Sequence, residues 1–194
     1  LGVADQRPDK DGIVRTYPLN WNEPNYKLPS IVKTTMMSAG IDAKSLPDDL
    51  TLNWRNKKGA YQRLSFADVL SMDENAPEAI ALKNAFVVLG VSAPGIGQVK
   101  PTAVKSIEDD NEILATALDD AVNGTYFRTA PGWLLLIVTI VLIWVIIYLG
   151  LLRISPLKIN QIFVVLQAAL AAITLLAVSY TTILVDLSGP MSFA

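Results

Sequence analysis

The sequence predicts an α/β domain, with a mixed or parallel sheet covered by helices, followed by a transmembrane α-helical hairpin. Three observations predict this fold class. Positions 1–131 hold 14 of the 16 basic residues and 17 of the 18 acidic residues. In positions 132–185 only Arg153 and Lys158 are charged, so this stretch has no side suited to water. Within positions 1–131, strand-like and helix-like patterns alternate, which is typical of helices packed on a sheet.

Strands and helices are expected at defined places in positions 1–131. In chain order these are a turn at 9–12, a strand at 13–19, a helix from Ser30 to Ser38 stopped by Gly40, a strand at 51–54, a basic turn at 56–59, a helix from Ser65 through Leu70 with Asp68 in a capping box, a strand at 85–91 and a helix at 111–123 ended by Gly124.

Two of these elements carry most of the expected core. Residues 85–91 read AFVVLGV, a continuous apolar run with β-branched residues, which predicts a strand buried on both faces. We expect this strand to be central and to need neighbours beyond those in this chain, so that 1–131 alone aggregates or remains loosely folded. The helix at 111–123 is amphipathic, and its apolar face comprises Ile113, Leu114, Ala117, Leu118, Ala121 and Val122.

The composition excludes most enzyme chemistry. The chain has no histidine and no cysteine, so imidazole and thiolate chemistry are absent, as are zinc and iron–sulfur sites built on cysteine. No serine, lysine or carboxylate shows the spacing of a nucleophile with its base. We therefore expect no enzyme activity, no catalytic, cofactor-binding or metal-binding residue, and no cofactor. The net charge of −2 argues against a nucleic-acid partner, because binding needs basic residues against phosphate.

Three motifs invite a chemical interpretation, and a structural one is favoured for each. Asp9-Lys10-Asp11-Gly12 is similar to part of a calcium loop, but the remaining ligands are missing, which favours a turn. The glycines after the apolar run do not have phosphate-loop spacing, which favours a tight turn. The acidic run before 111–123 favours a solvated helix start over a cation site. The residues concerned are Gly90, Gly95 and Gly97, and Glu108, Asp109, Asp110 and Glu112.

Two apolar runs are long enough to cross a bilayer. Residues 133–152 and 162–185 form the expected spans, since about 20 helical residues match the thickness of the hydrocarbon core. The loop 153–161 carries Arg153 and Lys158 and no acid, which places it in the cytoplasm. Residues 1–131 and a stub at 186–194, where a third span could start, then lie outside. Gln167 and the hydroxyls of the second span are expected to make helix–helix contacts.

Several segments, taken in order, resemble a known family, the CHASE domain of type two. They are Leu1-Gly2-Val3, Asp9 to Arg15 with Pro18-Leu19, Pro29-Ser30, Leu52-Asn53-Trp54-Arg55, Ser65-Phe66-Ala67-Asp68-Val69-Leu70, Leu82 to Gly90, and Ala117-Leu118 to Asn123-Gly124. The resemblance covers most of 1–131 and corresponds to the C-terminal half of the domain. The family's common histidine before the last helix is absent, and the stretch 95–110 departs from the usual glycine- and proline-rich pattern.

The resemblance implies an extracytoplasmic sensory module of a bacterial receptor in the inner membrane, with its main domain on the periplasmic side. In the family, cyclase or kinase outputs follow in the cytoplasm. The alternative is a non-catalytic scaffold that anchors a periplasmic face to a larger membrane complex. Expected partners are the lipid bilayer and either a missing N-terminal part of the same domain or another chain. A homodimer and an unknown small-molecule or protein ligand stay open.

Overall fold

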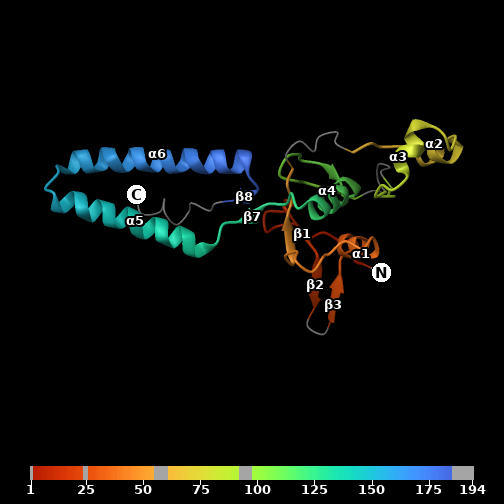
Figure 1. Cartoon of the computed structure of the whole chain (residues 1–194), viewed down its shortest axis with the longest axis horizontal. Coiled ribbons are helices and arrows are strands. Elements are labelled where there is room, and N and C mark those ends of the chain that lie inside the picture. The colour runs from red at the N-terminus through yellow and green to blue at the C-terminus, as the bar shows by residue number, and fades with distance from the viewer. Residues whose placement is uncertain (1, 24–25, 55–60, 92–97, 185–194) are drawn as a thin grey trace. The chain divides into compact units, whose positions relative to one another are not determined.

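The computed structural model describes residues 2–23, 26–54, 61–91 and 98–184 (Figure 1). The chain divides into two compact units, the first Leu1–Tyr126 and the second Phe127–Ala194. The basic turn expected at 56–59, Gly95 and Gly97, and the stub at 186–194 lie outside the described residues. Each unit is described by itself below.

The first unit is mixed α/β, with small two-stranded sheets instead of the expected parallel or mixed sheet. Its strand ladders, within the described ranges, are antiparallel: β1 with β4, β2 with β3, and β5 with β6. The last two pairs are joined by short connections, which favour antiparallel neighbours. The strands are β1 Thr16–Pro18, β2 Asn20–Glu23, β3 Tyr26–Pro29, β4 Asp49–Thr51, β5 Val99–Lys100 and β6 Glu108–Asp109.

The strands predicted at 13–19 and 51–54 are confirmed in place but are shorter or shifted. The first corresponds to β1, with an isolated bridge from Val14 to Thr102 extending it. The second is displaced toward the N-terminus as β4, where Leu50 lies opposite Tyr17. Leu52 continues the pairing, since its N–H donates to the Arg15 carbonyl over 2.9 Å.

The helices α1 Ile31–Ser38 and α4 Asp110–Asn123 confirm the sequence prediction closely. Ser30 caps α1 by accepting a hydrogen bond from the Lys33 N–H at 3.2 Å. Gly124 ends α4 in the left-handed conformation, at φ 66°, where glycine carries no Cβ penalty.

The helix expected after Ser65 forms as α2 Phe66–Ser71, but without the predicted capping box. Ser65 makes no side-chain cap hydrogen bond, and Asp68 lies in the first turn, where its charge favours the helix dipole. A further short helix, α3 Pro77–Leu82, begins with proline at its first turn, a position that needs no N–H donor. Neither α2 nor α3 contributes a buried residue.

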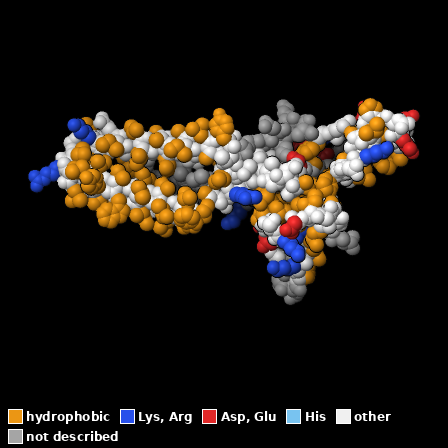
Figure 2. All heavy atoms as spheres, viewed as in Figure 1, with side chains coloured by type: hydrophobic (Ala, Val, Ile, Leu, Met, Phe, Trp, Pro, Cys, Tyr) orange, Lys and Arg blue, Asp and Glu red, His pale blue; other side chains and the backbone are white. Residues whose placement is uncertain are grey.

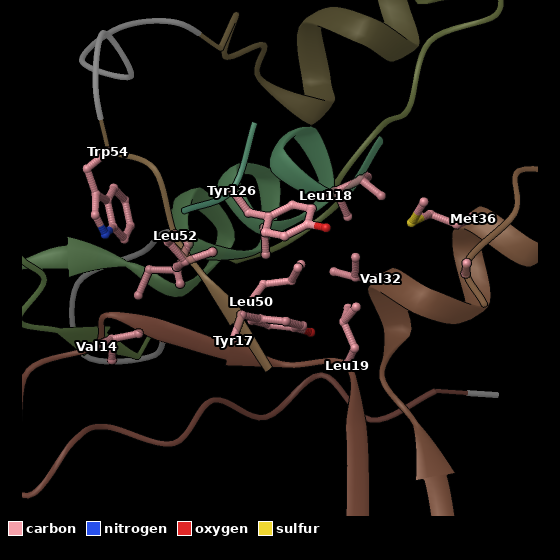
Figure 3. Close-up of a cluster of buried hydrophobic side chains, with 14 residues drawn as sticks. Val14, Tyr17, Leu19, Val32, Met36, Leu50, Leu52, Trp54, Leu118 and Tyr126 are labelled. Carbon is pink, nitrogen blue, oxygen red and sulfur yellow. The ribbon is translucent and has the colours of Figure 1, made fainter. Parts of the chain in front are cut away.

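The hydrophobic core gathers side chains from β1, β4, α1 and α4 (Figure 3). Tyr17, Leu19 and Leu50 are completely buried, as is Ile113 on α4. The predicted apolar face of α4 is confirmed, with four residues buried and Leu114 and Val122 partly buried against the core. The buried apolar set is Val14, Tyr17, Leu19, Val32, Met36, Ala43, Leu50, Leu52, Trp54, Ile113, Ala117, Leu118, Ala121 and Tyr126.

The predicted buried strand at 85–91 is wrong for this chain. These residues form no strand, and Phe86, Val87 and Leu89 are exposed, with Leu89 at 76%. The apolar β-branched run favours an extended conformation, but strand formation also needs a neighbour, and in the described residues none pairs with this segment.

The second unit contains two long helices, α5 Gly132–Leu151 and α6 Pro156–Tyr180. Strand β7 Arg128–Thr129, before α5, pairs in parallel with β8 Ile183–Leu184, after α6. The loop expected at 153–161 is too long: α6 begins at Pro156, so Lys158 belongs to the helix. Proline fits a first helical turn because its missing N–H has no partner there. At its other end, α6 stops at Tyr180, before the predicted limit of residue 185.

Both long helices are apolar around most of their circumference. They are long and apolar enough to cross a membrane, and no described residue in the most apolar stretch of each is buried. Apolar side chains cover the pair, and Lys and Arg side chains gather at the end where α5 connects to α6 (Figure 2). Arg153 and Lys158 belong to this end.

Candidate functional site

Three acids of the acidic run at the start of α4 are paired with other groups of the protein. Lys105 Nζ lies 2.8 Å from the Glu108 carboxylate, which is only 5% exposed. The Arg63 guanidinium pairs with the buried Glu112 carboxylate. Asp109 caps α4 by accepting from the Asn111 N–H at 2.9 Å. Each of these acids therefore has a partner from the protein, which favours the predicted helix start over a cation site.

Asp110 belongs to a second group of polar residues, which we call the Gln6 cluster: Asp5, Gln6, Lys100 and Asp110. Gln6 is 3% exposed, and its Nε2 donates to the Asp110 main-chain carbonyl at 3.1 Å. Lys100 Nζ donates to the Gln6 main-chain carbonyl at 3.4 Å. The same ammonium lies 3.8 Å from the Asp5 carboxylate and 3.7 Å from that of Asp110. The cluster thus joins the N-terminal segment and β5 to α4.

Two acceptor atoms of the Gln6 cluster are buried without a hydrogen-bond partner. They are Oε1 of Gln6 and Oδ1 of Asp110. Burial raises the pKa of the Asp110 carboxyl, and the Lys100 ammonium opposes this effect. The negative charges of Asp109 and Asp5 raise the pKa further.

A fully buried carboxylate fixes the other end of α4. Asp120 is 0% exposed. Its Oδ2 accepts from the Asn53 N–H at 2.6 Å, and its Oδ1 accepts from the Thr125 hydroxyl at 2.8 Å. Asn53 Nδ2 in turn donates to the Thr125 carbonyl at 2.9 Å. Because a buried polar group is tolerated only when it is hydrogen-bonded, this group positions α4 against the end of β4.

Asp9-Lys10-Asp11-Gly12 is a turn, as predicted. Gly12 has φ 81°, its N–H donates to the Asp9 carbonyl at 2.8 Å, and Asp11 accepts from the Ile13 N–H at 3.1 Å. Arg15 pairs with both carboxylates, at 2.9 Å to Asp9 and 2.7 Å to Asp11. Its hydrogen bond to Asp11 lowers the pKa of that carboxyl. The acidic pair therefore has a protein cation as its counter-ion.

Gly90 lies against Asn111 in the first turn of α4. A Cβ on Gly90 would lie 1.8 Å from the Asn111 side-chain oxygen, so a larger residue here requires the Asn111 side chain to move. Asn111 Nδ2 also approaches the neighbouring Val91 carbonyl at 3.4 Å. The structure thus explains one of the three glycines by close packing.

The most conspicuous surface of the first unit is apolar. No residue in the stretch 61–91 is buried, although α2, α3 and the segment 85–91 are rich in apolar side chains. We call the exposed ones the apolar strip: Phe66, Leu70, Ile80, Phe86, Val87, Leu89 and Val91, each 43% exposed or more. Exposed apolar side chains gathered in one stretch of chain favour an interaction site.

Sequence reasoning missed Gln6 and Asp120, and it named Asn53 only as part of a segment that resembles the family. For Asp120 a signal was present, because it lies seven residues after Ile113 and three after Ala117, on the buried face of α4. Gln6 lies before β1 and Asn53 lies after β4, and strands this short have no hydrophobic periodicity that would reveal residues beside them. In the described parts of the chain, no three Asp, Glu, His or Cys residues gather as metal ligands.

Comparison with known proteins gives one positive finding. The family model of the CHASE2 domain matches residues 1–152. No curated protein and no solved structure gives a significant match.

Proposed function

The chain belongs to the CHASE2 domain family, whose domains are extracellular sensory modules of signalling proteins, and we propose that here the module is membrane-anchored. Residues 1–131 lie on the periplasmic side of a bacterial inner membrane, α5 and α6 cross it, and their connection lies in the cytoplasm. The second unit supplies the observation that carries this proposal. Its helices expose apolar side chains to the surroundings, which only lipid or protein covers favourably.

The sidedness of the proposal rests on charge. Arg153 and Lys158 lie at the α5–α6 connection, and basic residues near short loops favour the cytoplasm. Before α5, Arg128 is the one base in the 20 residues 112–131, against Glu112, Asp119 and Asp120.

Transfer of a signal to the membrane is supported by the β7–β8 pair. The Arg128 N–H donates to the Thr182 carbonyl at 2.7 Å, and the Ala130 N–H donates to the Leu184 carbonyl at 2.8 Å. These bonds tie the start of α5 to the end of α6 just outside the apolar helices. A movement of the connector before α5 would therefore act on both helices together.

The proposed module has no catalytic role. Besides the lipid bilayer, we propose that it binds a polypeptide. The apolar strip supports a polypeptide partner, because residues 85–91 are an uninterrupted apolar and β-branched run whose larger side chains are exposed. We propose that another segment of polypeptide pairs with it, either the rest of the same domain or a separate chain. The same strip also favours the alternative of a scaffold that docks onto a larger complex.

Cysteine labelling tests the topology, since the chain has no cysteine of its own. We expect a membrane-impermeant maleimide added to intact inner-membrane spheroplasts to label Lys83→Cys, which is exposed in the first unit. Lys158→Cys should be labelled only after the membrane is permeabilised. Labelling of position 158 but not 83 from outside would invert the topology, and equal labelling of both before permeabilisation would refute membrane anchoring.

A further inference from the structure

The Gln6 cluster is the one place in the described chain where two partnerless acceptor oxygens belong to residues already hydrogen-bonded to each other. Gln6 Nε2 donates to the Asp110 main-chain carbonyl, which fixes the amide, because the flipped amide would place two acceptors together. Oε1 of Gln6 must therefore find a donor elsewhere. Oδ1 of Asp110 is also buried and also lacks a donor. Buried acceptors without partners are unfavourable, because they have lost the hydrogen bonds that water gives them in the unfolded chain.

The neighbouring cation does not supply the missing donors. Lys100 Nζ is 3.7 Å from Oδ2 of Asp110 and 3.8 Å from Asp5, both beyond hydrogen-bond length. Its one hydrogen bond in the cluster, at 3.4 Å, goes to the Gln6 main-chain carbonyl. The Lys100 side chain is 18% exposed, so the ammonium is held among three oxygens that it satisfies poorly.

A proton resolves this arrangement. We propose that the Asp110 carboxyl is a proton-binding site, and that proton uptake strengthens the joint between the N-terminal segment, β5 and α4. Protonation converts one partnerless acceptor into an O–H donor, and Oε1 of Gln6 is the acceptor without a partner in the same cluster. The proton comes from solvent and returns to it, with no other bond made or broken.

The surrounding charges are compatible with this role. Asp5 on the N-terminal segment and Asp109 on β6 are negative neighbours that favour the protonated form, and Lys100 on β5 opposes it. Glu108 and Glu112 are held by Lys105 and Arg63 and so are neutralised as pairs. Desolvation is the largest of the effects on Asp110 and raises its pKa above the ordinary value of 3.8.

The sign of the pH dependence follows from the raised pKa. The folded chain holds the Asp110 proton more tightly than the unfolded chain does. The contribution of Asp110 to stability is therefore fully present below pH 3.8 and is lost as the pH rises through the raised folded value. This is the reverse of the usual carboxylate behaviour shown by Asp11, whose pKa is lowered by Arg15. For a sensory domain, as proposed above, the proton would be a stimulus that acts on α4.

The test is a pH titration of the full chain in detergent micelles. NMR of ¹³C-labelled aspartate monitors the carboxyl groups at each pH. The Asp110 resonance is assigned from the spectrum of Asp110→Asn. We expect its midpoint above 3.8. Gln6→Met, which keeps the volume and removes the acceptor, should lower that midpoint by about one pH unit.

The Met variant separates the proposal from simple burial. If Gln6 merely shields Asp110 from water, an apolar methionine leaves the midpoint unchanged or raises it. Gln62→Met is the matched control, because it makes the same change at an exposed glutamine in the same unit, and it should leave the midpoint where it was. A wild-type midpoint at or below 3.8, or no decrease in Gln6→Met, overturns the proposal. Neither result bears on membrane anchoring, so the two proposals fail separately.

Discussion

A few residues of this chain are hard to replace, because their backbone conformation or their buried hydrogen bonds suit few other side chains. Gly12 is one of them, since its φ of 81° is needed to turn the chain between Asp11 and Ile13. We expect Gly12→Val to destabilise the first unit by about 1–3 kcal/mol, because a β-branched residue is strained in that conformation. Thermal unfolding followed by circular dichroism measures the change.

Gly12→Asn is the matched control for this strain. Open space surrounds the position, with no atom within 4 Å of an added Cβ, so size alone costs little. Asparagine adopts positive φ more readily than valine, and its loss should be clearly smaller. Equal melting temperatures for the wild type and both variants would contradict the turn.

Asp120 is the second such residue, because two donors depend on its carboxylate. We expect Asp120→Ala to destabilise the first unit by about 2–4 kcal/mol, since it leaves the Asn53 N–H and the Thr125 hydroxyl without this acceptor. Urea unfolding of the full chain measures the change. Asp68→Ala removes an exposed carboxylate from α2 and should change stability by well under 1 kcal/mol. A similar small loss for Asp120→Ala would show that its hydrogen bonds are dispensable.

At the scale of elements, local signals determined what the sequence could predict. Capping and termination residues such as Ser30, Gly40 and Gly124 act within one helical turn, and the helices they bound are where the sequence placed them. The first apolar helix was equally clear, because length and hydropathy suffice. Pro156 is different: proline is common both in loops and at the first turn of a helix, so the sequence pattern does not show that α6 begins there.

Pairing of strands was not predictable from the same signals. Residues 85–91 have the composition of a buried strand, but composition reports what a segment prefers and not whether a neighbour exists. The Gln6 cluster was also invisible, because Gln6 and Asp110 are separated by 104 positions. The sites that escaped prediction therefore depend on long-range contacts between short elements.

The apolar strip gives a prediction at the element scale. We expect residues 1–131, expressed without α5 and α6, to form soluble aggregates or a loosely folded species, because the described part of this unit leaves the strip exposed. Size-exclusion chromatography with light scattering measures this.

Changing Val87 and Leu89 to threonine, which keeps β-propensity and reduces hydrophobicity, should shift the material toward monomer. The same changes at Val99 and Val104, exposed but outside the strip, are the control. A wild-type monomer with a sharp cooperative melt would contradict the prediction.

At the scale of the whole molecule, the question is whether the two units act together. The described connection is short: α4 ends at Asn123 and β7 begins at Arg128. A short connector transmits displacement, whereas a long flexible one dissipates it. We therefore expect a substitution in the first unit, such as Asp120→Ala, to affect the second unit. In the reconstituted full chain it should change the fluorescence of a dye attached to Lys158→Cys.

A flexible insert between Tyr126 and Phe127 should abolish that response. The insertion point lies at the division between the units and leaves the β7–β8 hydrogen bonds intact. An insert of about 15 Gly/Ser residues after Lys44, in an exposed loop of the first unit, is the control and should preserve the response. A signal transmitted through the backbone must pass the interrupted connector, so its loss supports a sensor that drives the helices. A response that survives the connector insert would show that the first unit does not act through α5, and the scaffold alternative would then explain the anchored domain better.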